Sequence, residues 1–320
     1  AYLAFFVQLS AFPQSYAQVF APRVEKFADR CRILLWIGRR DWFTHPAKPI
    51  RTPEDMTNAP TASQLRLVAV PRLAAGGRWR VEAMRSLSEP CLIWFTKGQG
   101  RITISGVTRG YTAHNAIFIP PGIMHGFEAG PQVFGTAVFF GRNTPVALPK
   151  VPLHLRIREV HAQQEVNILL DSILREMESN TPAHDRATEA YVDLLGVWLE
   201  RQARKADPET PRPDATRRLV ARYTALLERN FRTGMGVADF AAALGVTPTH
   251  LTRCCNIACG RPAIALLQDR RIFEARKLLA ETRMPVGRIA EQLGFNSPAY
   301  FTRAFQHMTG KSPTAFRRTI

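Results

Sequence analysis

Short apolar segments, separated by turn residues, dominate the chain between residues 64 and 140. Glycine and proline pairs occur at residues 76–77, 120–122 and 130–131, where glycine allows positive φ and proline interrupts a hydrogen-bonded ladder. Many short strands with regular punctuation predict an all-β barrel or sandwich. The predicted strands are residues 65–70, 78–84, 91–96, 101–105, 116–119 and 133–140.

After Pro152 the apolar residues recur with the period of a helix. One stripe runs along residues 166–177, and a second follows along residues 191–199. These two amphipathic helices can cap the barrel or pair with a second copy of the chain, so a homodimer is a hypothesis. The stripes consist of Val166, Leu169, Leu170, Ile173, Leu174 and Met177, and of Tyr191, Leu194, Leu195, Trp198 and Leu199.

Residues 204–216 have the composition of a linker, with three prolines, charged neighbours and almost no large apolar residue. The first Met is Met56, directly before the first clear domain pattern. We therefore expect residues 1–55 to be a tag-like, poorly ordered or wrongly assigned extension. The predicted divisions are a poorly defined extension (1–60), a barrel (61–150), amphipathic helices (151–203), the linker (204–216) and a helical domain (217–320).

The helical domain contains an internal repeat. Residues 237–246 (Val-Ala-Asp-Phe-Ala-Ala-Ala-Leu-Gly-Val) correspond to residues 286–295 (Val-Gly-Arg-Ile-Ala-Glu-Gln-Leu-Gly-Phe). Residues 250–253 (His-Leu-Thr-Arg) likewise correspond to residues 300–303 (Tyr-Phe-Thr-Arg). The offset is 49 residues before the turn and 50 after it, so the second turn is one residue longer.

Each copy has the layout of a helix-turn-helix, in which glycine permits a left-handed step and the second helix enters the major groove. Ser297 and Pro298 give the second recognition helix a suitable start. Residues 262–279 read as one helix about 27 Å long, comparable to the ~34 Å between successive major-groove faces. One chain can thus place both recognition helices in adjacent segments of the groove.

The distribution of positive charge predicts that a polyanion binds to the helical domain. The chain has 43 Lys and Arg against 26 Asp and Glu, a net charge of +17, and residues 214–320 hold 17 against 7, a net +10. Such an excess favours nucleic acid or an anionic membrane surface, and the repeat selects double-stranded DNA. No apolar stretch is long enough for a membrane helix and no secretory leader pattern is present, so we expect no membrane partner and a cytoplasmic protein.

The helical domain resembles the AraC/XylS family of bacterial regulators over about residues 219–318. In that family this segment forms a seven-helix DNA-binding domain. The resemblance implies a sequence-specific regulator, often an activator that contacts RNA polymerase, with an N-terminal domain that senses a small molecule. It rests on Arg271-x3-Ala275-x2-Leu278-Leu279, Ile289-Ala290-x2-Leu293-Gly294-Phe295, Tyr300-Phe301-x-Arg303-x-Phe305 and Gly310-x2-Pro313.

Helical spacing predicts which side chains contact DNA. Leu251 and Cys255 are i, i+4 neighbours that should face the core, as should Phe301 and Phe305. Arginine can bind guanine bidentately, with a phosphate contact as the alternative, and threonine offers a hydroxyl and a methyl group. Because prolyl and alanyl side chains make no hydrogen bonds, we expect the first unit to supply more base readout. The predicted contacts are Thr249, Thr252 and Arg253, then Pro298, Ala299, Thr302 and Arg303.

The cysteines do not predict a metal site. Cys254, Cys255 and Cys259 correspond in the repeat to Ala304, Phe305 and Thr309, which are ordinary packing and turn residues. The five cysteines are unevenly spaced, as in a protein of a reducing compartment without a disulfide framework.

Residues 121–125 (Pro-Gly-Ile-Met-His) follow an apolar segment and resemble the second motif of cupin barrels, loosely over residues 64–140. Cupin enzymes complete a metal site with two His and a Glu in a first motif, but residues 80–106 contain no His, so we predict neither metal nor cofactor. A barrel without metal remains a good container for a small effector. The candidates that line it are Trp79, Arg85, Trp94, Phe95, His125 and Phe127.

The predicted fold class is α+β and multidomain: a cupin-like β-barrel with following helices, then an all-α domain of two helix-turn-helix units joined by a long helix. The predicted function is an effector-responsive, non-enzymatic DNA-binding transcription regulator, of the activating kind by resemblance alone. Two alternatives stay open: a cupin-type metalloenzyme fused to a DNA-binding module, and a constitutive DNA-binding protein whose barrel only dimerises.

Overall fold

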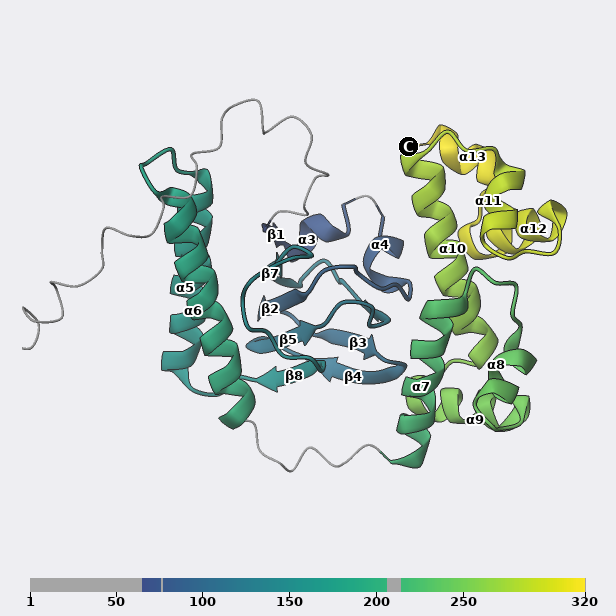
Figure 1. Ribbon diagram of the computed structural model, residues 1–320, viewed down its shortest axis with the longest axis horizontal. Coiled ribbons are helices and arrows are strands. Elements are labelled where there is room, and N and C mark those ends of the chain that lie inside the picture. Colours follow the sequence, from purple (N-terminus) through teal and green to yellow (C-terminus); the bar gives the residue numbers. More distant parts are fainter. Residues whose placement is uncertain (1–64, 76, 206–213, 320) are drawn as a thin grey trace, which may run out of the picture. The chain divides into compact units, whose positions relative to one another are not determined.

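The computed structural model describes residues 65–75, 77–205 and 214–319 (Figure 1). These residues all belong to one compact unit that spans residues 60–320. Strands fill the first part of this unit and helices fill the second, which confirms the α+β class. The predicted extension over residues 1–60 and the centre of the predicted linker lie outside the described residues.

The strands form two antiparallel sheets. The five-stranded sheet has the order β1-β7-β2-β5-β8, and the three-stranded sheet has the order β4-β3-β6. Their bounds are β1 (Arg66–Ala69), β2 (Cys91–Lys97), β3 (Gly100–Ile104), β4 (Val107–Tyr111), β5 (Asn115–Ile119), β6 (His125–Phe127), β7 (Phe134–Phe139) and β8 (Leu153–Arg156).

The predicted cupin-like barrel is not confirmed: in the described residues no ladder of hydrogen bonds joins the two sheets, so they do not close into a barrel. The five-stranded sheet ends at β8 and the three-stranded sheet ends at β4. The chain leaves β8 for a helix at Val160 without returning to pair with β4. A seam therefore stays open between these two edge strands.

Strand alternation builds a core on each face of the five-stranded sheet. In β2, Ile93 and Phe95 pack toward the three-stranded sheet, whereas Leu92 and Trp94 pack toward the helices α5 (Val160–Glu178) and α6 (His184–Lys205). Both predicted amphipathic stripes are thus confirmed as helices, and the pair covers the outer face of this sheet (Figure 1). Residues 91–95 of β2 are buried on both faces, which explains the unbroken apolar run over these residues.

The predicted strand at residues 78–84 is wrong. Its centre forms the single helical turn α4 (Trp79–Glu82), and another short turn, α3 (Val70–Leu73), follows β1. The alternation of apolar and polar residues there fits a strand, but Arg78 and Glu82 form an i, i+4 ion pair at 2.7 Å that suits a helix.

The second part of the unit is helical, as predicted. The predicted helix at residues 262–279 is confirmed as α10. The helices are α7 (Ala215–Asn230), α8 (Val237–Ala243), α9 (Pro248–Cys259), α10 (Ala263–Glu281), α11 (Val286–Gln292), α12 (Pro298–Thr309) and α13 (Pro313–Arg318).

A buried group of ion pairs fixes α7 against α10. The Arg270 guanidinium donates to both carboxylate oxygens of Glu228 at 2.7 and 3.0 Å, and to Glu274 at 2.9 Å. Arg232 also donates to Glu274, at 2.6 Å. Burial opposes ionisation of Glu274, but the two arginines outweigh it and hold the pKa of this carboxyl below its ordinary value. The neighbouring Arg271 donates to the backbone carbonyls of the loop after α7.

Candidate DNA-binding interface

Both turns predicted by the repeat are present. Gly245 ends the α8 segment with φ +71°, and Gly294 ends the α11 segment with φ +69°. Glycine adopts this left-handed conformation without the steric cost of a Cβ atom. The two turns share their backbone geometry as well as their sequence pattern.

The recognition helices α9 and α12 begin in the same way. The Thr247 hydroxyl accepts a hydrogen bond from the backbone N–H of His250, and the Ser297 hydroxyl accepts one from Tyr300. A proline occupies the first turn of each helix. This start was predicted from the sequence only for the second unit, although the first unit has the equivalent pair Thr247 and Pro248.

The predicted inner faces of both helices are confirmed. Leu251 and Cys255 of α9 are completely buried, as are Phe301 and Phe305 of α12. These side chains hold each recognition helix on the common core of the helical region. The opposite faces are consequently free of core packing.

The residues predicted to contact DNA lie on these outer faces. Thr249 and Arg253 of α9 are exposed, and Thr252 is partly exposed. In α12, Pro298, Ala299 and Arg303 are exposed, and Thr302 is partly exposed. Thr302 uses its hydroxyl to bond the backbone carbonyl of Pro298 at 2.9 Å, while the Arg253 guanidinium lies 3.1 Å from His250 Nδ1.

Two further polar side chains lie on the outer faces and were not among the predicted DNA contacts. Asn256 of α9 and Gln306 of α12 are exposed and lie 50 residues apart, the same offset as Arg253 and Arg303. Each follows its arginine by three residues, so it lies one helical turn further along the same face. Both units therefore present Thr, Arg and a side-chain amide in the same order. Aligning the two copies for three residues beyond Arg253 and Arg303 would have identified this amide position from the sequence.

The chemistry of this outer surface suits DNA. Neither α9 nor α12 contains an acidic residue. Arginine can pair with guanine and an asparagine or glutamine amide can pair with adenine in the major groove. The two helices thus offer cationic and amide groups without a carboxylate that would repel phosphate.

Cys254, Cys255 and Cys259 belong to α9, where Cys254 and Cys255 are buried and Cys259 is partly buried. Burial raises the pKa of the Cys255 thiol to about 12, and the Cys259 thiol donates to the backbone carbonyl of Cys255. Within the described residues, no three His, Cys, Asp or Glu side chains come together as a metal site would require.

The structure brings together part of the predicted effector-binding set. Arg85, Phe95, His125 and Phe127 lie between the two sheets, where Phe95 and Phe127 have ring centroids 6.0 Å apart. His125 is 1% exposed, and burial, together with Arg85, lowers its pKa to about 3. The Arg85 guanidinium donates to the Val81 carbonyl at 2.7 Å.

Trp79 and Trp94 do not join this group. The Trp79 ring lies 5.7 Å from Phe273 and 6.1 Å from Phe316. The Trp94 indole donates to Asn167 of α5 at 2.8 Å, on the helix-facing side of the sheet. Strand alternation accounts for Trp94, because its neighbours Ile93 and Phe95 take the inner face.

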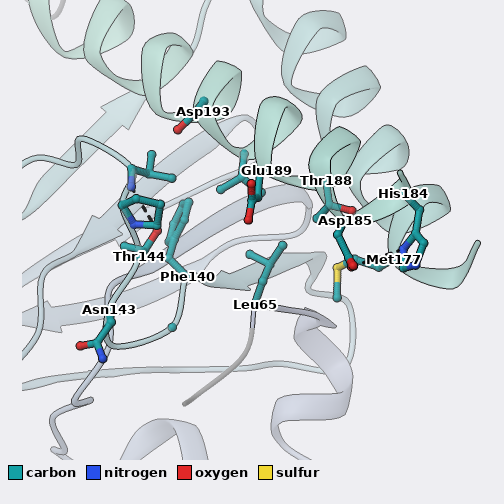
Figure 2. Close-up of a pocket in the computed structure, with 14 residues that line it drawn as sticks. Leu65, Phe140, Asn143, Thr144, Met177, His184, Asp185, Thr188, Glu189 and Asp193 are labelled. Atoms are coloured by element: carbon teal, nitrogen blue, oxygen red, sulfur yellow. Dashed lines mark hydrogen bonds and ion pairs between the residues drawn. The ribbon is translucent and has the colours of Figure 1, made fainter. Parts of the chain in front are cut away.

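An open cavity of about 650 Å³ lies between the end of β7 and the α5–α6 pair (Figure 2). Phe140 and Val192 form part of its wall, and Asp185, Glu189 and Asp193 follow one another along α6 at its rim. The carboxylates are solvent-exposed, with an exposed fraction of 89% for the Asp185 side chain. This cavity contains none of the residues predicted to bind an effector.

Two helix-turn-helix units with matching turns, helix starts and outer faces define a DNA-binding domain. Residues 240–319 match the family model described as a helix-turn-helix domain, so this part of the chain is a helix-turn-helix domain of the kind that transcription regulators use.

The similar proteins are named as transcription regulators. The chain is 28% identical to the arabinose operon regulatory protein of Escherichia coli over 131 residues, which are 40% of this chain and 45% of that protein. It is 30% identical to the virulence regulon transcriptional activator VirF of Yersinia enterocolitica over 98 residues, 31% of this chain and 36% of that protein. The matches span less than half the length of these curated relatives.

Among solved structures, ToxT of Vibrio cholerae with a bound unsaturated fatty acid matches 82% of this chain and 97% of its own, at 14% identity and a TM-score of 0.40.

Of the described helices, none is sufficiently long and apolar to cross a lipid bilayer.

Proposed function

We propose that this protein is a sequence-specific transcription regulator that reads double-stranded DNA with both helix-turn-helix units. The observation that carries the proposal is the equivalence of the outer faces of α9 and α12, each with Thr, Arg and an amide side chain at matching positions. The net charge of +10 over residues 214–320 supports a polyanionic partner, and the named relatives support a regulatory role.

The proposed binding mode places α9 and α12 in successive segments of the major groove. α10 has 19 residues, which corresponds to about 28 Å at 1.5 Å per residue. Arg253 and Asn256 read bases through α9, and Arg303 and Gln306 do so through α12. Pro298 and Ala299 add only apolar contact, so specificity relies more on the first unit.

The proposal extends to a small-molecule effector held by the cupin-like sheet region, and to contact with RNA polymerase as an activator. Pairing of α5 and α6 with a second copy is also proposed. Exposed apolar side chains support that pairing, since Ile168 is 63% exposed and Leu194 is 52% exposed, and exposed patches of this kind often mark interaction surfaces.

Selection of binding sites from a random pool of duplex DNA tests the function. We expect enrichment of a motif with two half-sites about one helical turn apart. Arg253→Ala should remove the preference at one base pair and weaken binding by ~1–3 kcal/mol, with Asn256→Ala acting at a neighbouring pair.

Arg186→Ala, at an exposed position of α6, is the matched control and should leave the motif unchanged. A uniform loss of affinity across all sequences in Arg253→Ala would assign this side chain to phosphate. Failure to enrich any motif would contradict sequence-specific regulation altogether.

A further inference from the structure

A second cavity, of about 210 Å³, lies at the open seam between β4 and β8. Its walls include Ile102, Ile104 and Val107 of the three-stranded sheet, and α7 contributes Arg217 and Ala221. It is smaller than the cavity in Figure 2 but, unlike that cavity, it includes side chains from a helix of the DNA-binding part of the chain.

Strand register explains why these side chains meet. Ile102 pairs with Arg109, and Ile104 pairs with Val107, so these residues share one face of the three-stranded sheet. Ile102 belongs to the core between the sheets, which identifies that face as the inner one. On β8, His154 pairs with Ile117 of the same core. The cavity is therefore the unfilled end of the space between the sheets.

The charged groups of this cavity are cationic. Arg109 and Arg217 line it, and no Asp or Glu does so among the described residues. The guanidinium groups of both arginines form no ion pair or hydrogen bond that the described residues supply. The third titratable group, His154, accepts a hydrogen bond at Nε2 from the Asn115 amide at 3.1 Å. Burial and the nearby Arg109 lower the pKa of His154 to about 4, so its ring is neutral near pH 7.

Apart from Ser105, the remaining walls are apolar. They come from Ile102, Ile104, Val107, Pro152, Leu153 and Ala221. An engineered cavity of about 150 Å³ holds one benzene molecule, so 210 Å³ has room for a ring or short branched chain with one acidic group. Guanidinium groups bind planar carboxylates through paired hydrogen bonds, which identifies the acidic group that this site suits.

We propose that this cavity binds a small organic monocarboxylate, with its charge between Arg109 and Arg217 and its apolar body against the β3–β4 hairpin. The inference rests on the proposed function, because the occupant would be the effector of the regulator.

The position of the cavity links its occupant to the DNA-binding helices. A Cβ atom on Gly106, in the β3–β4 turn, would lie 2.4 Å from Val220 Cγ1, so this turn packs closely on α7. Tyr223, one helical turn further along α7, donates to the Ala263 carbonyl at the start of α10 at 2.8 Å. An occupant that contacts Arg217 and Ala221 thus acts on the helix that supports the first helix-turn-helix unit.

Isothermal titration of the full chain with sodium benzoate tests the proposal. Benzoate should bind saturably, and benzamide, which lacks the charge, and inorganic phosphate, which lacks the apolar body, should each bind at least about tenfold more weakly. Arg109→Gln and Arg217→Gln should each weaken benzoate binding by about tenfold or more. Ala221→Leu should abolish binding, because its side chain fills the cavity while every charge is kept.

Arg186→Gln on α6 is the control and should leave benzoate binding unchanged. Arg109→Lys retains the charge at the edge strand and should bind better than Arg109→Gln, which separates a lost contact from a damaged sheet. The proposal is overturned if benzoate shows no saturable binding up to about 10 mM, if phosphate binds as well as benzoate, or if the three cavity variants bind benzoate like the unmodified protein.

The selection of DNA motifs described above, carried out once without and once with benzoate, separates the two claims. An enriched motif in a protein that does not bind benzoate overturns only the carboxylate site. A protein that binds benzoate through Arg109 and Arg217 but enriches no motif under either condition keeps the site and overturns the proposed regulatory function.

Discussion

Gly245 and Gly294 occupy the same position in the two turns but have different surroundings. A Cβ atom on Gly245 would meet no atom within 4 Å, whereas one on Gly294 would lie 2.3 Å from the backbone nitrogen of Gly234 and 2.7 Å from the Arg232 carbonyl oxygen. The first turn faces open space, and the second is packed against the loop after α7.

Gly245→Ala should therefore destabilise the protein by ~1 kcal/mol, the cost of a left-handed alanine. Gly294→Ala should cost clearly more, since the backbone of the α7–α8 loop must also move. Urea unfolding of both variants measures the difference in the free energy of unfolding. Equal costs at the two positions would show that the loop yields without resistance.

At the residue scale, the sequence predicted the inner residues of the recognition helices correctly, because a spacing of four places them on one helical face. It could not distinguish the two glycines, since their difference comes from a loop some 60 residues earlier in the chain. Trp94 was predicted to line the barrel together with Phe95, but neighbouring residues of a strand take opposite faces. Because residues 91–95 of β2 are all apolar, composition alone does not indicate which of them face inward.

Among the elements, α7 and α10 depend on one another through the buried Arg270. Its side chain is 6% exposed, and its partners Glu228 and Glu274 are 15% and 10% exposed. Arg270→Met keeps the side-chain length but leaves two carboxylates without this cation. We expect a loss of ~3–5 kcal/mol in the free energy of unfolding, as for a broken buried ion pair.

Arg288→Met provides the matched control. Arg288 and Glu291 form an ion pair on α11 at 2.8 Å, with side chains 74% and 59% exposed, and removal of such a pair should cost at most ~1 kcal/mol. Thermal unfolding of both variants checks the contrast. A similar, small loss in Arg270→Met would mean that water reaches the two carboxylates.

The elements that the sequence predicted best are long and strongly periodic, such as α5, α6 and α10. The strands it missed are β4, β6 and β8, which have five, three and four residues. β4 contains Arg109 and Gly110, which are not typical of strands. Such short segments become strands only because a neighbouring strand supplies the hydrogen bonds, and that partner is not visible in the local pattern.

For the molecule as a whole, the concentration of positive charge in the DNA-binding part predicts the salt dependence of binding. A protein that contacts six to ten phosphates should lose about 10³–10⁵ in affinity between about 50 and 200 mM salt. Titration of the selected DNA motif at several salt concentrations measures the slope. Arg186→Ala should leave the slope unchanged, and a nearly flat dependence would contradict binding dominated by phosphate contacts.

The net positive charge of residues 214–320 and the internal repeat were sufficient to predict the helical region and DNA as its partner. The sheet region was predicted less well because closure of a barrel depends on whether its edge strands pair, which no local pattern encodes. The seam between β4 and β8, and the cavity within it, emerge only from the three-dimensional structure.

The continuous helix α10 also constrains how relatives of this protein can diverge. Each residue inserted into α10 would rotate one recognition helix by about 100° relative to the other. A single insertion would therefore direct α12 away from the groove that α9 enters. Seven residues, close to two full turns, would nearly restore the phase but lengthen the spacer by about 10 Å. Viable length changes should therefore accumulate in the loops outside α10, and the spacing of the operator half-sites should change more slowly than their sequence.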